Sequence, residues 1–411
     1  MHNKRAKQRM LEVFIQDPWG IRGPGAYTYS LCNALAKHGL DVHLITNQYY
    51  EYDELSNFEV TKVFFKHSEK MKEGKIRKII RGFEYVTTMM RLLYIYLNSK
   101  PDIIHIQWLL LYQFDFFWLR ILKFMLRKSK TKLVLTAHNV LPHVNGYKHK
   151  SILMKIYPQF DAIIVHGEAL KSQMHNILGA STKNITIEVI PHGSQTISFR
   201  KINMERVAEY EKSIQIRRNN KGRRFLFIGV IHKNKGLDIL LKAWEKHLLR
   251  YPNDTLYIVG KPVYNIKNEL QIIKNKFNKT VLISMGFKSD EEIMAYYLST
   301  DFVVLPYKEA SQSGVLLSAL TLGKPVIVTN VGELPSTVNA VSGGYIVPPN
   351  DFVSLCEALD KASKVPFVVL SKWSKNIQKK TYEKFSWDSV AVSTIKLYNR
   401  LLFNAIGERL E

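Results

Sequence analysis

The chain has 411 residues, 46% of them hydrophobic, which is enough for two large domains with cores of their own. Lys and Arg outnumber Asp and Glu by 59 to 35, and the resulting net charge of +24 favours a polyanionic partner or surface. No stretch reaches the roughly 18 uninterrupted apolar residues of a membrane span, and the two cysteines, Cys32 and Cys356, stand apart from any second thiol, which indicates a reducing compartment without a disulfide framework.

The first half of the chain alternates short β-like runs with helical stretches. Its N-terminal residues are rich in cations but run directly into a strand pattern at 11–15, which argues against a signal peptide. Further strands are expected at 42–46, 103–106, 133–136, 163–165 and 187–190. Such an alternation predicts a parallel, doubly wound sheet.

A glycine-containing loop follows the first predicted strand. Gly20, Gly23 and Gly25 precede a helix expected at 28–37, and an open loop at a helix N-terminus suits the close approach of a phosphate or a sugar. The spacing is not the dinucleotide fingerprint G-x-G-x-x-G, and the second strand ends in Thr46-Asn47 rather than in an acidic residue. Nicotinamide binding is therefore disfavoured.

Two basic segments, residues 70–100 and 116–132, interleave cations with large apolar side chains. Helices of this composition can lie in the headgroup region of an anionic leaflet, although solvated faces of ordinary domain helices have the same composition. The sequence shows no zinc-finger spacing, RNP-type aromatic motif or basic leucine zipper, so nucleic acid is not expected as a partner.

The strand pattern starts afresh in the second half, after a strongly charged stretch at 196–224. We place a domain boundary near residues 194–222 and expect strands at 224–228, 256–259, 281–283, 302–305, 325–328 and 345–347. Between the strands expected at 302–305 and 325–328 lies a loop of small polar residues, which is followed by a helix. Its unpaired N–H groups and helix dipole suit a phosphate, although an ordinary β-loop-α-β unit gives the same pattern.

In their shared order, these segments resemble the retaining glycosyltransferases of family four. The resemblance runs nearly end to end and rests on the following segments: the glycine loop 20–25, Pro101 to Trp108, Leu135 to Asn139, Asp161 to Gly167, Val189 to Gly193, Phe227 to Leu237, and 301–329. It implies the α/β GT-B fold, with two Rossmann-like, doubly wound parallel-sheet domains facing each other across a cleft. The expected domains are 1–200 for the acceptor and 201–385 for the nucleotide sugar, with a helix at 386–411 that crosses back to the first domain.

The resemblance also assigns roles to individual residues. Lys235 matches the diphosphate-binding lysine of the family, and His138 matches a histidine that faces the donor sugar, although a purely structural role for this ring stays open. Where the family usually has an arginine, this chain has His232, and Lys233 is an alternative second cation. The donor contacts expected besides these are Gly23, Gly25, Ser311, Gln312, Ser313, Gly314 and Ser318.

The largest departure from the family concerns a pair of glutamates that hold the sugar and the ribose. The second of them falls on Ser318, and the first falls on Ala310, with Glu309 one position away. We expect Glu309 to be the surviving sugar contact and Ser318 to make a weaker ribose contact. The donor base and the sugar cannot be deduced from this loop.

The resemblance implies transfer of a hexose from a nucleoside-diphosphate sugar to an acceptor hydroxyl with retention of configuration. No Asp-x-Asp motif is present, so neither a metal nor a cofactor is expected. The expected acceptor is a glycan linked to polyprenyl diphosphate, in capsule, exopolysaccharide or O-antigen assembly. The expected location is the cytoplasm, at an anionic membrane surface on the inner face. Two alternatives are a catalytically silent scaffold, favoured by Ser318 and His232, and a sugar-nucleotide epimerase.

Overall fold

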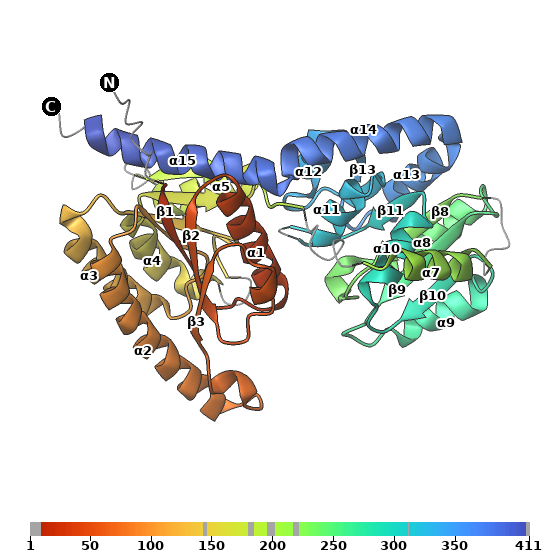
Figure 1. Ribbon diagram of the computed structural model, residues 1–411. Helices are drawn as coiled ribbons and strands as arrows, with labels where there is room; N and C mark the ends of the chain where they lie inside the picture. The colour runs from red at the N-terminus through yellow and green to blue at the C-terminus, as the bar shows by residue number, and fades with distance from the viewer. Residues whose placement is uncertain are drawn as a thin grey trace, which may run out of the picture. The chain divides into compact units, whose positions relative to one another are not determined.

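The computed structural model describes residues 10–142, 146–179, 185–194, 202–216, 222–310 and 312–407. The chain divides into two compact units: unit 1 comprises Met1–Gly193 and Trp387–Glu411, and unit 2 comprises Ser194–Ser386. The boundaries between the units therefore lie at 193/194 and 386/387. The boundaries expected from the sequence were 200/201 and 385/386. Each unit is an α/β domain built on its own parallel sheet (Figure 1).

The sheet of unit 1 has seven parallel strands in the order β3-β2-β1-β4-β5-β6-β7. They are β1 (Glu12–Asp17), β2 (Asp41–Asn47), β3 (Glu59–Phe64), β4 (Ile103–Ile106), β5 (Lys132–Thr136), β6 (Ala162–Val165) and β7 (Thr186–Val189). The sequence pattern predicted all of these except β3. That strand lies at the edge of the sheet, and its partly exposed residues include Glu59 and Lys62, so it lacks the apolar run of a central strand.

Helices and short 3-10 turns connect the strands of unit 1. They are α1 (Arg22–Lys37), η1 (Asp53–Leu55), η2 (Ser68–Lys70), α2 (Lys75–Ser99), α3 (Tyr112–Met125), η3 (Leu126–Lys128), α4 (Gly146–Ile156), η4 (Tyr157–Gln159), α5 (Glu168–Leu178) and α15 (Trp387–Gly407). Although α15 is distant in sequence, it packs against α1 (Figure 1). None of the helices in the described ranges is long and apolar enough to cross a membrane.

The expected start of the first helix was wrong, because α1 begins at Arg22 and not at Thr28. Glycine and proline are poor residues for a helix interior, and the sequence pattern therefore assigned Gly23, Pro24 and Gly25 to a loop. In the structure they form the first turn of α1, where a proline costs no hydrogen bond because its N–H would have no helical acceptor.

The sheet of unit 2 has six parallel strands in the order β10-β9-β8-β11-β12-β13. Its strands are β8 (Arg224–Ile228), β9 (Thr255–Gly260), β10 (Val281–Met285), β11 (Phe302–Leu305), β12 (Val326–Thr329) and β13 (Gly344–Val347). Its helices are α7 (Met204–Ile216), η6 (Lys233–Lys235), α8 (Leu237–Leu248), α9 (Lys267–Lys276), α10 (Asp290–Leu298), α11 (Gly314–Thr321), α12 (Leu334–Val341), α13 (Phe352–Lys364) and α14 (Phe367–Phe385). All six strands were predicted, because each contains a short apolar run; the four inner strands are almost fully buried, and the edge strands β10 and β13 are mostly partly buried.

Each sheet has a point at which the strand order reverses, between β1 and β4 in unit 1 and between β8 and β11 in unit 2. In open α/β sheets, ligands bind at the carboxyl ends of the strands at such points. The loops that leave these four strands contain Gly20, Gln107, Lys235 and Ser313.

Candidate functional site

Lys235 lies in the loop that leaves β8 and ends at α8. Its Nζ lies 3.5 Å from the centroid of the Tyr307 ring, and burial lowers the pKa of its ammonium group to about 8. The next residue, Gly236, has a φ of +72°, and a Cβ at this position would lie 1.9 Å from the carbonyl oxygen of Pro306. Gly236 is therefore required for the β8 loop to pack against the end of β11 with Lys235 in this place.

The loop that leaves β11 meets the β8 loop through backbone and side-chain contacts. The backbone N–H of Lys308 donates to the carbonyl oxygen of Asn234 at 2.7 Å, and Asn234 Nδ2 donates to the carbonyl oxygen of Glu309 at 3.4 Å. The Tyr307 hydroxyl lies 3.4 Å from Ser313 Oγ. Ser313 is the N-cap of α11, and its Oγ accepts a hydrogen bond from the Leu316 N–H at 3.3 Å.

Unit 2 therefore brings Lys235 together with the backbone of Glu309 and with Ser313 and Gly314, where α11 begins. A cation and the N-terminal N–H groups of a helix then lie at one edge of the sheet, an arrangement suited to a phosphate. The side chain of Glu309 is exposed at the same loop.

The remaining residues expected in unit 2 take different positions. His232 and Lys233 are exposed in the turn that precedes Lys235. Gln312 is partly buried, whereas Ser311 lies outside the described residues. Ser318 is in the second turn of α11, partly buried and beside the hydroxyl of the buried Tyr297.

The sequence pattern did not identify Glu333, a buried carboxylate at the same edge of unit 2. It is 4% exposed, follows β12 and is the N-cap residue of α12, and its Oε2 accepts a hydrogen bond from Ser336 Oγ at 2.8 Å. The end of β12 is tied to the β11 loop, because Thr329 Oγ1 donates to the carbonyl oxygen of Tyr307 at 2.6 Å. The sequence feature that could have identified Glu333 is its position as an acidic residue shortly after a buried strand.

In unit 1, the buried Asp17 organises the turn between β1 and α1. Its carboxylate accepts hydrogen bonds from the N–H groups of Trp19 and Gly20, both at 3.1 Å, and from Thr28 Oγ1 at 2.6 Å. Gly20 has a φ of +42°, and a Cβ there would lie 1.8 Å from Thr46 Oγ1. The glycine at this position is therefore required for the chain to turn close to β2.

The two other glycines of this loop differ in their surroundings. A Cβ on Gly25 would lie 2.5 Å from the carbonyl oxygen of Gly20, so Gly25 serves the packing of the first turn of α1. A Cβ on Gly23 would have no atom within 4 Å, and this residue is exposed. Of the two, only Gly23 leaves its backbone open to a ligand.

His138 follows β5, is partly buried, and belongs to a network of histidines in unit 1. His166 Nδ1 lies 3.0 Å from the carbonyl oxygen of Ile190, which can only accept, so Nδ1 carries the proton. In a neutral His166, Nε2 then accepts from His138 Nδ1 at 3.2 Å. Burial lowers the pKa of His138 well below its ordinary value and that of His166 to about 3, so both rings are neutral at pH 7.

Gln107 connects His138 to a second buried ring, His105. Gln107 Oε1 lies 3.2 Å from His138 Nε2, and Gln107 Nε2 lies 3.3 Å from His105 Nε2. This orientation of the amide fits a protonated His138, whereas a neutral His138 requires the flipped amide, which donates to its Nε2. His105 also contacts Thr136 Oγ1 at 2.7 Å and the Tyr398 hydroxyl of α15 at 2.6 Å. The network thus holds His138 from both ring nitrogens.

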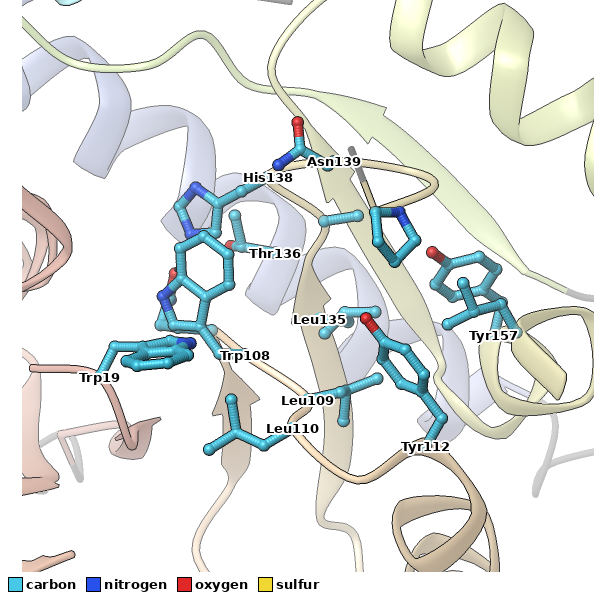
Figure 2. A pocket seen from close by; sticks show the side chains of 14 residues that line it. Trp19, Trp108, Leu109, Leu110, Tyr112, Leu135, Thr136, His138, Asn139 and Tyr157 are labelled. Atoms are coloured by element: carbon cyan, nitrogen blue, oxygen red, sulfur yellow. The ribbon is translucent and has the colours of Figure 1, made fainter. Parts of the chain in front are cut away.

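A cavity of about 360 Å³ opens beside His138. Figure 2 shows His138, Trp108 and Trp19 gathered at one side of it, with Tyr112 and Tyr157 at the other. The His138 and Trp108 rings are stacked, with centroids 4.3 Å apart and planes inclined by 8°. The described residues that line the cavity are Trp19, Gln107, Trp108, Leu109, Leu110, Tyr112, Leu135, Thr136, Ala137, His138, Asn139, Pro142, Leu153 and Tyr157.

Two family models match the chain. The one described as Glycosyltransferase Family 4 matches residues 21–196, and the one described as Glycosyl transferases group 1 matches residues 222–364. Between them they cover His138, Lys235, Glu309 and Ser313, whereas β1 with Asp17 and the helix α15 lie outside both matches.

Two proteins of similar sequence are named as glycosyltransferases, and a solved structure has the same fold. The chain is 27% identical over 57% of its length to the uncharacterized glycosyltransferase MJ1607 of Methanocaldococcus jannaschii, and it spans 59% of that protein, which is less than two thirds. It is 26% identical over 65% of its length to the capsular polysaccharide biosynthesis glycosyltransferase CapM of Staphylococcus aureus, and it spans 70% of it. The crystal structure of Anabaena Alr3699/HepE in complex with UDP has the same fold, with a TM-score of 0.70 and 15% identity over 95% of this chain and 100% of that one.

Proposed function

The chain belongs to the family 4 glycosyltransferases and has their GT-B fold, and from this premise we propose that it transfers a hexose from a nucleoside-diphosphate sugar to an acceptor hydroxyl with retention of configuration. The observation that carries the proposal is the meeting of Lys235 with the N-terminus of α11 in unit 2. The complex of the Anabaena protein with UDP supports a nucleoside diphosphate as the ligand.

Unit 2 would bind the donor through its diphosphate. As the bond from the sugar to the diphosphate breaks, negative charge grows on the leaving oxygen. The ammonium group of Lys235 and the N–H groups at Ser313 and Gly314 are fixed before the reaction, so they stabilise this charge without reorganising. We propose that these groups act without a metal ion, because they already supply positive charge at the diphosphate.

His138 and Glu309 are proposed as the residues that face the sugar. Both ring nitrogens of neutral His138 are already bonded, Nδ1 to His166 and Nε2 to the amide of Gln107, so a sugar hydroxyl that bonds to Nε2 takes the place of Gln107. The exposed carboxylate of Glu309 can accept hydrogen bonds from sugar hydroxyls. The weaker contacts proposed to the donor are those of Gly23, His232, Lys233, Gln312 and Ser318.

Nucleotide binding tests this proposal and has a predicted pH dependence. At about 100 times its dissociation constant, a nucleoside diphosphate should stabilise the protein by about 2.7 kcal/mol in thermal unfolding. Because the pKa of Lys235 is about 8 in the free protein, raising the pH through 8 removes its charge. The dissociation constant should therefore rise above pH 8, by up to about tenfold per pH unit.

The control for this experiment is Lys235→Ala, in which binding should be weaker and independent of pH between 7 and 9. Stabilisation by none of the nucleoside diphosphates would contradict a donor site in unit 2. Binding of a nucleotide without sugar transfer to any acceptor would instead favour the catalytically silent scaffold.

We further propose that the acceptor is lipid-linked and that unit 1 binds an anionic membrane through α2 and α3. Opposite its buried face, α2 exposes a row of apolar side chains, which are between 52% and 72% exposed: Ile76, Ile79, Phe83, Met90 and Tyr94. On the neighbouring α3, the exposed apolar residues are Phe117, Ile121, Phe124 and Met125. A large exposed apolar surface marks an interaction site.

Charge decides which partner suits this surface. Exposed cations flank the apolar rows, among them Lys75, Lys78, Arg91 and Arg120. A second copy of the chain would bring like charges together, whereas an anionic leaflet attracts each cation near its surface by about 1 kcal/mol. Such a location suits a glycan linked to polyprenyl diphosphate, and the name of CapM supports capsule assembly as the setting.

Co-sedimentation with anionic vesicles tests this part of the proposal. We expect binding at low salt that is lost at high salt and in the variant Lys75→Gln/Lys78→Gln/Ile79→Ser/Phe83→Ser. Arg77 and Arg81 are unsuitable targets, because both pair with Glu69 and their side chains are only 19% exposed.

The matched control changes two exposed lysines of α9, Lys267→Gln/Lys274→Gln, and should bind as the unmodified protein does. Failure to bind anionic vesicles even at low salt would favour a soluble acceptor.

A further inference from the structure

We infer that the cavity of unit 1 binds an uncharged pyranose ring of the acceptor, an inference that rests on the proposed glycosyl transfer. Its volume of about 360 Å³ lies in the range of about 300 to 1,000 Å³ that is usual for small-molecule sites. It is lined at the carboxyl ends of three strands, by Trp19 after β1, Gln107–Leu110 after β4 and Ala137–Asn139 after β5. This is the edge at which an open α/β sheet binds ligands.

The absence of charge in the cavity restricts the ligand. The described residues that line it include no Lys, Arg, Asp or Glu. Of these lining residues, His138 is the one whose ordinary pKa lies near 7. Burial lowers the pKa of its ring, so His138 is neutral at pH 7. A phosphate or a uronic acid carboxylate would lose its hydration here without gaining a cation, which is strongly unfavourable. The part of the acceptor that enters the cavity is therefore uncharged.

Two polar groups argue for a sugar rather than an isoprenoid chain. The Trp108 Nε1–H is buried and has no acceptor among the residues that the structure describes, and the partly buried Asn139 also lines the cavity. A pyranose offers hydroxyls to polar groups of this kind, whereas an isoprenoid chain offers no hydrogen-bonding group. The electron-rich faces of aromatic rings such as Trp19 and Tyr112 suit the C–H bonds of a sugar ring.

Saturation-transfer NMR on the full-length protein without donor tests the inference. The probes are the methyl glycosides of glucose, galactose and N-acetylglucosamine, compared with methyl glucuronide, glucose 1-phosphate and geranyl phosphate. We expect signals from at least one uncharged glycoside and none from the charged probes at the same site. Leu110→Trp, which fills the cavity, should weaken glycoside binding at least tenfold.

A second variant keeps the test decisive if Leu110→Trp does not fold. Asn139→Asp adds a charge without changing the volume of the side chain, and it should also weaken binding at least tenfold. Phe287→Ala removes an aromatic ring of unit 2 that is 81% exposed and should leave binding unchanged. The inference is overturned if no uncharged glycoside binds, if both cavity variants keep full binding, or if geranyl phosphate displaces the glycoside.

These outcomes are separate from the failure of the proposed function. Stabilisation by nucleoside diphosphates depends on unit 2 and should persist in Leu110→Trp and Asn139→Asp. Loss of glycoside binding with intact nucleotide binding therefore concerns the cavity alone.

Discussion

Replacing Lys235 by alanine is expected to reduce kcat/KM for sugar transfer by about 100-fold or more. Fixed electrostatic groups that face developing charge contribute on this scale, and about 2.7 kcal/mol of transition-state stabilisation corresponds to that factor. The fold should persist, because the variant removes a cation whose burial already opposes its charge. Steady-state kinetics with a nucleotide sugar, together with circular dichroism, would measure both effects.

Lys246→Ala is the matched control for this variant. Lys246 also lies over an aromatic ring, with its Nζ 4.8 Å from the Phe352 ring centroid, but it is exposed near the C-terminal end of α8. Its removal should change kcat/KM by less than about threefold, because exposed charges contribute little. Near-normal turnover in Lys235→Ala would refute its role at the diphosphate.

Glu309→Gln is expected to reduce kcat/KM by about 10- to 100-fold, because a hydrogen bond to a charged acceptor contributes about 1.5 to 3 kcal/mol. The loop itself should keep its shape, since Asn234 holds the backbone carbonyl of Glu309 and not its carboxylate. The comparison is Ser318→Ala, for which we expect a change below about threefold. Ser318 is partly buried beside Tyr297 and offers only a neutral hydroxyl.

The comparison requires kcat/KM of both variants, measured with the same nucleotide sugar. Small and equal effects would mean that the loop binds the donor through its backbone alone, at the N-terminus of α11.

Much of the fold could be predicted because each central strand is a local signal. The strand β8 (Arg224–Ile228) is an apolar run buried on both faces, and its bounds agree with the predicted 224–228. The edge strand β3 carries charged residues on a partly solvated strand, so its pattern resembles that of a loop. The start of α1 was misplaced for a local reason too, since Pro24 is unfavourable in a helix except in the first turn.

The candidate site was predictable only where its residues stand directly after strands of one sheet. Lys235 and the Ser313–Gly314 turn stand in loops that follow single strands, so their meeting follows from the order of the strands. His105 and Tyr398 are 293 positions apart, and nothing local indicates that they share a hydrogen bond. The aromatic cavity has the same property, because Trp19, Trp108 and Tyr157 come from three separate segments.

The place of α15 in unit 1 has a consequence for biosynthesis. Residues of α15 are fully or almost fully buried in unit 1, among them Val390, Leu397 and Tyr398. The ribosome makes α15 only after the whole of unit 2, and chains grow at about 5 to 20 residues per second. For the time that unit 2 takes to be translated, the nascent unit 1 exposes the apolar surface that α15 will cover. We therefore expect unit 1 to complete its packing only after α15 has been made, when unit 2 is already able to fold.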